Sequence, residues 1–401
     1  MLFKKASVII TTMNIIHLAP YYAPAYAFGG VVRSVEGLAQ AQARRGHAVT
    51  VLTTDALDRQ ARYAGPAEEV LDGVRVVRAR NLSPWLRGRL NLSTPPGLPA
   101  AARRLLPEAD VLHSHEFRTV ENLLVTPIAA RLGRPLALSP HGTLALNTGR
   151  SGFKAAWDRL FSPAMARRFD RIIGLTAAEA AEAESLWAAF GGQARVQVIP
   201  NGVDPDEYAD LPGRAAFREK YGLGDAPVCL FMGRLHPRKG VVALVEAFRQ
   251  ANILGARLVI AGPDEGALDA VRPLLDGRMI LTGYLGGQDR LAALAAADVL
   301  ALPAVGEGLP MVALEAMAAG RPVIVSPGCY LPEAAQYGAG LEVEPAVEPL
   351  AAALETLLCN ADLRARMGAA AQVLVRMRFA WDNVTRQMET VYQEMIEGQE
   401  A

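Results

Sequence analysis

The sequence repeats one local pattern: a short apolar run, a loop with glycine, and a helix-length segment whose apolar residues lie three or four apart. Residues 15–18 form the first run and lead to Phe28-Gly-Gly30. Helical spacing then continues as far as Gly46, and residues 48–52 form the next run. Alternation of short apolar runs with helices is typical of parallel sheets covered on both faces.

The pattern starts again in the second half of the chain. Four further apolar runs read as strands, at residues 227–232, 257–261, 298–302 and 322–325. A chain of 401 residues that is 51% apolar can bury the cores of two or three domains. Residues 200–205 are rich in turn formers and predict a hinge. We therefore predict two doubly wound α/β domains facing a central cleft, with ligands at the carboxyl ends of the strands.

Two glutamates separated by seven residues give the strongest indication of function. Glu307 lies on a Gly/Pro loop, and Glu315 lies inside the helix that this loop opens. Pro310 suits the first turn of that helix and Gly320 suits its end. A helix N-terminus behind such a loop attracts anions. Carboxylates on both sides of an anion site favour a ligand with hydroxyls on both sides of its phosphates, such as a nucleotide-sugar.

The loop at residues 233–240 carries Arg234 and Lys239 between a predicted strand and a helix. A solvated basic loop is the simpler interpretation of these charges. The position just before the helix favours an anion site instead, in which Arg provides a forked contact to a diphosphate and Lys a point charge.

Gly29 and Gly30 occupy the corresponding loop of the first half. The G-x-G-x-x-G spacing of a dinucleotide site is absent there, so a dehydrogenase is disfavoured. The two glycines either form a tight turn or allow the backbone to approach a substrate closely.

His141 follows a predicted strand, between proline and glycine. Structural and functional roles have about equal weight for it. His113 and His115 share one face of a predicted strand, but without a third ligand they are weak metal candidates. The acidic sequence Asp204-Pro-Asp206 lies in the predicted hinge and reads as part of the linker.

The net charge of zero hides an uneven distribution. Residues 1–200 carry 24 Lys and Arg against 15 Asp and Glu, and the remainder is acidic to the same extent. Either the basic half meets a polyanion or an anionic membrane, or the two halves attract each other. The basic, aromatic residues 153–169 are a candidate membrane contact and equally a core helix end.

Cys229, Cys329 and Cys359 show no metal-type spacing and predict a reduced, cytosolic chain in which the cysteines are mostly core residues. No apolar run has the length of a membrane span. Residues 1–12 read as an extension ahead of Met13 rather than as a signal sequence.

Taken in order, these motifs resemble those of the retaining glycosyltransferases of family 4, which have the GT-B fold. The resemblance covers nearly the whole chain and rests on segments 28–30, 44–47, 140–142, 199–204 and 233–240 and on the glutamate pair. It implies an N-terminal acceptor-binding Rossmann-like domain at residues 1–203, a donor-binding Rossmann-like domain at 204–378, and a C-terminal helix at 379–401 that crosses back onto the first domain.

The resemblance also implies roles for single residues. Arg234 and Lys239 would bind the donor diphosphate, and Glu315 would bind the ribose hydroxyls. Glu307 would contact the transferred sugar near the reacting centre, and His141 would approach that sugar from the N-terminal domain.

Backbone N–H groups around Gly308, Leu309 and Met311 would contact the phosphates, and the Gly29-Gly30 loop would border the diphosphate and the acceptor. Pro310 stands where many members have glycine and removes one N–H donor. We expect no metal and no cofactor, because cationic side chains and a helix end neutralise the diphosphate.

The reaction implied is transfer with retention of anomeric configuration by front-face attack, with the acceptor proton passing to a leaving phosphate oxygen. Double displacement on a carboxylate stays open. The expected partners are a nucleotide-sugar donor and a glycan or lipid-linked acceptor, with peripheral contact to the inner face of an anionic membrane and no nucleic acid. The alternatives are a nucleotide-sugar epimerase or a phosphorylase of the same fold, and a non-catalytic nucleotide-sugar-binding protein.

Overall fold

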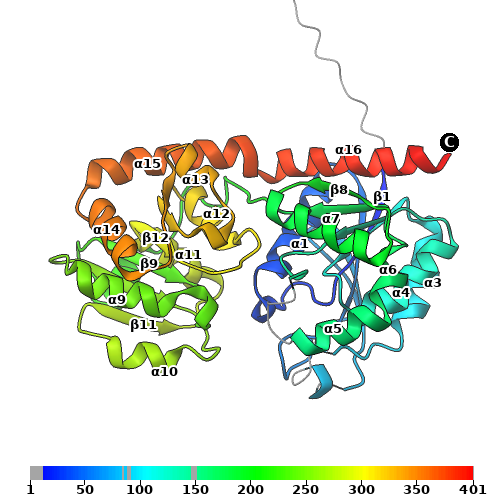
Figure 1. Cartoon of the computed structure of the whole chain (residues 1–401), viewed down its shortest axis with the longest axis horizontal. Coiled ribbons are helices and arrows are strands. Elements are labelled where there is room, and N and C mark those ends of the chain that lie inside the picture. Colours follow the sequence, from blue (N-terminus) through cyan, green and yellow to red (C-terminus); the bar gives the residue numbers. More distant parts are fainter. Residues whose placement is uncertain (1–11, 84, 88–91, 146–150, 401) are drawn as a thin grey trace, which may run out of the picture. The chain divides into compact units, whose positions relative to one another are not determined.

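A computed structural model describes residues 12–83, 85–87, 92–145 and 151–400 (Figure 1). The contacts between residues in space divide the chain into two compact units. Unit 1 comprises the residues up to Ile173, then Glu182–Gln197 and the residues from Gln387 onward; unit 2 comprises Gly174–Ala181 and Val198–Arg386.

Unit 1 is built on an eight-stranded sheet with the order β3-β4-β2-β1-β5-β6-β7-β8. Its strands are β1 Asn14–Leu18, β2 Ala48–Thr54, β3 Glu68–Leu71, β4 Val74–Ala79, β5 Val111–His115, β6 Leu136–Ser139, β7 Arg171–Gly174 and β8 Arg195–Val198. Along the sheet, strands β4, β2, β1, β5, β6 and β7 pair in parallel, and β3 lies antiparallel to β4 at the edge. The first two predicted strands are confirmed within two residues at their ends.

Helices surround this sheet (Figure 1). They are α1 Gly30–Arg44, α3 Leu98–Leu105, α4 Val120–Arg131, α5 Ser151–Leu160, α6 Ser162–Ala166 and α7 Ala177–Phe190. Successive residues of β2 enter different clusters: Val51 packs with Val35 of α1, whereas Leu52 packs with Leu98 and Leu105 of α3. Because neighbouring side chains on a strand point to opposite faces, both faces of the sheet are buried, as the apolar runs predict.

Unit 2 is built on a six-stranded parallel sheet with the order β11-β10-β9-β12-β13-β14. Its strands are β9 Val228–Met232, β10 Arg257–Ala261, β11 Met279–Gly283, β12 Val299–Leu302, β13 Val323–Val325 and β14 Gly340–Glu342. Its helices are α8 Arg214–Lys220, α9 Val241–Ala251, α10 Leu268–Val271, α11 Gly287–Ala296, α12 Met311–Ala318, α13 Glu333–Gln336, α14 Val347–Leu358 and α15 Ala361–Leu374. The predicted repeat of the strand–loop–helix pattern is confirmed.

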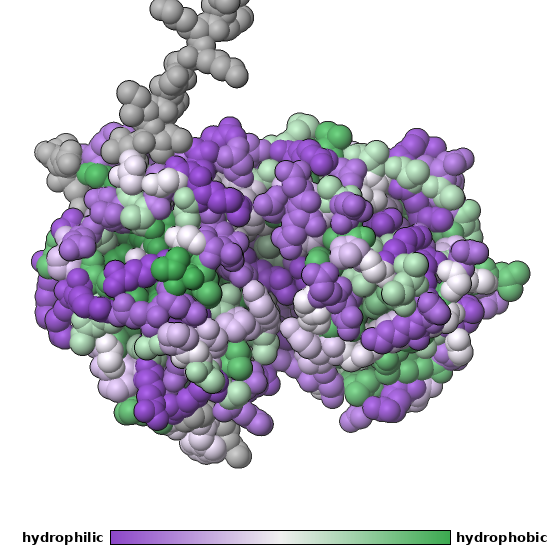
Figure 2. Space-filling view, turned by 180° about the vertical axis from the view of Figure 1, so that it is seen from behind, coloured by the Kyte–Doolittle hydropathy of each residue, from purple (hydrophilic) through white to green (hydrophobic). Residues whose placement is uncertain are grey.

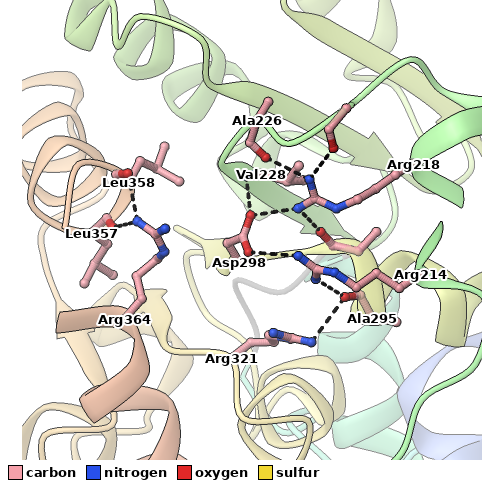
Figure 3. Close-up of polar contacts among 12 residues, drawn as sticks. Arg214, Arg218, Ala226, Val228, Ala295, Asp298, Arg321, Leu357, Leu358 and Arg364 are labelled. Atoms are coloured by element: carbon pink, nitrogen blue, oxygen red, sulfur yellow. Dashed lines mark hydrogen bonds and ion pairs between the residues drawn. The ribbon is translucent and has the colours of Figure 1, made fainter. Parts of the chain in front are cut away.

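One carboxylate anchors the amino-terminal ends of the two central strands of unit 2 (Figure 3). Asp298 accepts hydrogen bonds from the backbone N–H of Val228 at 2.8 Å and from Arg218 at 2.9 Å. Arg218 also donates to the carbonyl of Ala296, and Arg214 donates to that of Ala295. This network lies at the end of the strands opposite to the loops that follow β9 and β12, so we assign it to stability.

The last helix, α16 Trp381–Glu400, follows a π-helical turn at Val375–Phe379. From Gln387 onward it belongs to unit 1. Glu389 accepts two hydrogen bonds from Arg45, at 2.6 and 2.9 Å, and lies 2.8 Å from His47 Nε2. The predicted return of the C-terminal helix to the first domain is therefore confirmed, and residues 44–47 provide its polar anchor.

The face shown in Figure 2 is mostly hydrophilic, with apolar residues in separate small groups. Within the described residues, no helix is both long and apolar enough to cross a membrane. Cys229 and Cys329 are buried as predicted, whereas Cys359 is exposed, and none of the three forms a disulfide.

Candidate active site

The loop after β9 carries two of the predicted donor-binding side chains. Arg234 is exposed, and its Nη1 lies 2.7 Å from Glu265 Oε2. Lys239 Nζ lies 2.5 Å from Glu307 Oε1, and both side chains are largely buried. The structure thus brings Lys239 and Glu307 together, although 68 positions separate them along the chain.

This loop lies close to the loop after β12 because of a glycine and an arginine. Gly240 has a φ of +70°, and a Cβ there would lie 2.0 Å from the carbonyl oxygen of Pro303, so only glycine fits. The carbonyl of Arg238 accepts from the N–H of Val305 at 2.7 Å, and its guanidinium donates to the carbonyls of Val305 and Gly306. The basic composition of the loop is visible in the sequence, but the structural role of Arg238 is not.

Helix α12 starts directly after the loop that holds Glu307. Met311 is its first residue, and Pro310 is the N-cap with an extended ψ of 117°, one position earlier than the predicted first turn. No side chain caps this end in the described part of the chain. Its free N–H groups and positive dipole end suit an anion. Gly308 is half-buried and Leu309 is buried, both directly before this helix end.

Glu315 lies on α12 and is buried, with 3% of its surface exposed. Its Oε2 accepts a hydrogen bond from Arg290 of α11, whose guanidinium also donates to the hydroxyl of Tyr208 at 3.1 Å. Burial opposes the charge of Arg290, but Glu315 and Tyr208 outweigh it and raise the pKa of the guanidinium. Sequence analysis missed Arg290 and Tyr208, because nothing local marks them as partners of Glu315.

In unit 1, the Gly29-Gly30 pair opens α1 directly beyond the loop that follows β1. Gly29 is the N-cap with φ +94° and ψ −151°, a conformation that favours glycine, and Gly30 is the first helical residue. No other atom lies within 4 Å of a Cβ placed at Gly29. The glycine is therefore required by the backbone conformation and leaves open space beside the helix end.

Two non-glycine residues in the left-handed conformation follow neighbouring strands of unit 1. Glu116, with φ +61°, comes directly after β5, and His141, with φ +57°, comes two residues after β6. Such conformations cost about 1–3 kcal/mol each and gather at functional sites. Burial raises the pKa of Glu116 to about 7, and its carboxylate accepts a hydrogen bond from the hydroxyl of Tyr21 at 3.2 Å. Sequence analysis missed Glu116.

His141 belongs to a cluster of four histidines. Its Nε2 lies 2.9 Å from Nδ1 of His115, and burial lowers its pKa to about 4. His113 and His115 lie on β5 as predicted, but the expected lack of a third histidine is wrong, because His17 of β1 stands beside them. The pairing of β1 with β5 brings these residues together, and the sequence does not show which strands are neighbours.

Asp204 and Asp206 form a local turn, in which the N–H of Asp206 donates to the Asp204 carboxylate at 3.2 Å. This turn fits the prediction that the two aspartates belong to the linker. The predicted site residues thus fall into two groups: Arg234, Lys239, Glu307, Gly308, Leu309, Met311 and Glu315 in unit 2, and Gly29, Gly30 and His141 in unit 1.

Comparison with known proteins identifies the family of the chain. Residues 28–207 match the family described as Glycosyltransferase Family 4, and residues 226–360 match Glycosyl transferases group 1. The chain is 32% identical over 371 residues to the GDP-mannose-dependent alpha-(1-6)-phosphatidylinositol monomannoside mannosyltransferase of Mycobacterium tuberculosis, covering 86% of this chain and 89% of that protein. It is 30% identical to the D-inositol 3-phosphate glycosyltransferase of Kineococcus radiotolerans, covering 99% of this chain and 98% of that protein.

Solved structures show the same architecture. The Anabaena protein HepE, in complex with UDP and glucose, superposes with a TM-score of 0.73 at 21% identity, covering 95% of this chain and 99% of that chain. Sucrose-phosphate synthase from Thermosynechococcus elongatus superposes with a TM-score of 0.72 at 20% identity, covering 96% of this chain and 100% of that chain. The fold is GT-B, and the protein is a glycosyltransferase. It belongs to glycosyltransferase family 4.

Proposed function

We propose that this glycosyltransferase moves a hexosyl group, with retention of configuration, from a nucleoside diphosphate sugar to a hydroxyl of a lipid-linked or growing glycan. The observation that carries the proposal is the Lys239–Glu307 pair beside the start of α12, which no described side chain caps. A cation and a helix N-terminus together suit a diphosphate, and the adjacent carboxylate suits sugar hydroxyls.

In this proposal each donor-side residue has one task. Lys239 leaves Glu307 and binds the diphosphate, together with Arg234 and the first N–H groups of α12. Glu307 is then free to orient the transferred sugar. Glu315 binds the ribose through Oε1, for which the described residues provide no hydrogen-bond partner, while Arg290 holds Oε2.

Charge development in the reaction agrees with this assignment. Negative charge grows on the departing diphosphate as the bond to the sugar breaks, and preorganised cations and N–H dipoles stabilise it most strongly at that moment. The acceptor hydroxyl gives its proton to a leaving phosphate oxygen, so the reaction needs no protein base and no metal. The family resemblance assigns a contact with a sugar hydroxyl to His141 of unit 1.

Similarity to a mannosyltransferase that uses GDP-mannose and a phosphatidylinositol mannoside supports a mannosyl donor and a membrane-borne acceptor. The surface of unit 1 supports the second point. Phe153, Leu160 and Phe161 of the α5 region are 47%, 68% and 39% exposed, next to the exposed Arg159. Exposed aromatic and aliphatic residues with basic neighbours suit the cytoplasmic face of an anionic membrane. Trp157 and Phe169, in contrast, are buried, as the core interpretation of this stretch has it.

The donor assignment is tested by substituting Lys239. UDP-, GDP- and ADP-sugars are first screened for a rise in melting temperature, since a bound donor stabilises the folded state. With the best donor, Lys239→Ala is expected to lower kcat/KM at least about 100-fold, because one positioned charge is lost from the transition state. The melting temperature without donor should stay near that of the wild type.

Lys220→Ala is the matched control, because Lys220 is an exposed lysine of the same unit, 3.7 Å from Asp289. Wild-type transfer by a folded Lys239→Ala variant would overturn the donor site. Product NMR then separates the remaining alternatives: an inverted anomeric centre would contradict retention, and sugar conversion without an acceptor would indicate an epimerase.

A further inference from the structure

A row of four buried or half-buried side chains crosses unit 1, and the proposed chemistry uses only its last member. Gln42 Oε1 lies 2.6 Å from His17 Nε2, His17 Nδ1 lies 2.9 Å from His115 Nε2, and His115 Nδ1 lies 2.9 Å from His141 Nε2. Gln42 and His17 are fully buried, His115 is 1% exposed, and His141 is half-buried. We call these residues the histidine chain.

Four elements of unit 1 contribute to the histidine chain. Gln42 comes from α1, His17 from β1, His115 from β5, and His141 from the left-handed turn after β6. Neighbouring rings stack, with centroids 5.2 Å apart at both steps. Both ring nitrogens of His17 and of His115 have partners within the histidine chain. A change of tautomer at one ring therefore requires a change of tautomer at the next ring.

The protonation pattern follows from these contacts. Burial lowers the pKa of each ring, to about 4 for His17 and His141 and well below 6.5 for His115, so all three are neutral at pH 7 and carry one N–H each. The Gln42 amide turns its oxygen to His17 and its NH₂ to the hydroxyl of Tyr392, at 3.4 Å.

Since an amide oxygen only accepts, His17 must donate from Nε2, which makes its Nδ1 an acceptor. His115 then donates from Nε2 to His17, and His141 donates from Nε2 to His115. Nδ1 of His141 is left as a lone pair, and no described residue hydrogen-bonds to it.

We propose that Gln42, His17 and His115 are positioning residues that fix the tautomer and the ring orientation of His141, so that its Nδ1 accepts a hydrogen bond from a hydroxyl of the bound sugar substrate. This inference rests on the proposed role of His141. A histidine held in one tautomer by an inner partner is a better-defined acceptor than one that turns freely, because no reorganisation is required when the substrate binds.

A metal site is the competing interpretation of the same cluster, because ring nitrogens of His17, His113 and His115 lie within 4.8 Å of one another. The third ring is occupied as well: His113 Nδ1 lies 2.6 Å from the Tyr392 hydroxyl, and Nε2 lies 2.9 Å from Ser139 Oγ. A metal would have to break these buried hydrogen bonds, which disfavours it.

The tautomer can be measured directly on full-length protein labelled with ¹⁵N-histidine. The two ring nitrogens of a neutral imidazole give well-separated ¹⁵N signals, and His141 is assigned by the signals that disappear in His141→Ala. We expect wild-type His141 to carry its proton on Nε2. In Gln42→Leu, which removes the acceptor at the far end, we expect mixed tautomers at His141.

Kinetics with the screened donor supply the second readout. Gln42→Leu should lower kcat about tenfold or more, while most of the donor-induced rise in melting temperature remains, because the proposed donor residues of unit 2 are intact. Ser139→Ala is the matched control: Ser139 is equally buried but contacts His113 and lies outside the histidine chain. It should change neither the tautomer nor kcat. If Gln42→Leu does not fold, His17→Phe interrupts the chain one step further along.

A proton on Nδ1 of wild-type His141, or an unchanged tautomer in a folded Gln42→Leu variant, would overturn the proposal. So would stoichiometric shifts of the His17, His113 and His115 signals on addition of zinc. Full transfer by His141→Ala would overturn the link to catalysis, whereas the donor site is judged separately by Lys239→Ala.

Discussion

At the scale of single residues, the candidate site residue Glu315 of unit 2 is held by a buried ion pair with Arg290. Glu315 and Arg290 are 3% and 7% exposed, and each is the charged partner of the other. Removing the partner of a buried carboxylate destabilises the fold by more than the intact pair stabilises it. The position of Glu315 therefore depends on Arg290, 25 residues earlier, and loss of either should affect the fold as well as the proposed ribose contact.

Arg290→Met is expected to lower the free energy of unfolding by about 3 kcal/mol, because it leaves the Glu315 carboxylate buried and unpaired. Chemical denaturation at pH 7 measures the change. The double variant Arg290→Met/Glu315→Leu should recover much of the loss, since both charges are then gone. A single variant as stable as the wild type would contradict the buried pairing.

At the scale of elements, the carboxylate of Glu389 helps to anchor α16 to unit 1. Burial alone would raise the pKa of Glu389, but hydrogen bonds from His47 and Arg45 outweigh it and hold the pKa below its usual value. The contribution of this carboxylate to stability is therefore complete above the unfolded pKa, near about 4.3, and is lost as the pH falls through the lower folded value.

We expect Glu389→Gln to destabilise the protein by about 1–3 kcal/mol at pH 7, because a charged acceptor is lost. The difference from the wild type should shrink between about pH 5 and pH 3, where the wild-type carboxylate takes up its proton. Denaturant unfolding at several pH values measures this. Glu397→Gln, at an exposed position of the same helix, should match the wild type throughout, and a constant difference at all pH values would contradict the role of the charge.

At the scale of the whole molecule, an uneven charge distribution accompanies the two-unit architecture. The basic first 200 residues contain the exposed apolar groups of α5, and the acidic remainder contains the residues assigned to the donor. This division suits a membrane-borne acceptor on one unit and a soluble donor on the other. Buried Trp157 shows why residue type alone could not define the surface proposed for membrane contact.

Substitution of Phe153, Leu160 and Phe161 by serine is expected to reduce co-sedimentation with anionic phospholipid vesicles at least about fivefold, with unchanged donor binding. Wild-type binding should weaken as salt rises from low to physiological concentration. Leu254→Ser is the control. Leu254 of unit 2 is 98% exposed, so this substitution removes apolar surface outside the α5 region. An equal loss of co-sedimentation in the control, or no vesicle binding by the wild type at low salt, would contradict the membrane proposal.

The sequence by itself determined the strand and helix pattern and the two-fold repeat of that pattern, and it supplied the residues that we propose for the donor side. All of these follow from local spacing: apolar runs define strands, and Gly, Pro and charged residues at fixed offsets define loops and helix ends. Arg234, Lys239, Glu307 and Glu315 could be named because each belongs to such a local motif.

Only the tertiary structure decided which of these residues meet. Lys239 reaches Glu307, Arg290 reaches Glu315, and His17 reaches His115 across 98 positions of sequence, because strands β1 and β5 are neighbours in the sheet. The order of strands in the sheet is set by the packing of the whole unit and cannot be inferred from the spacing of nearby residues. For that reason the histidine chain behind His141 emerged only when the strands were placed side by side.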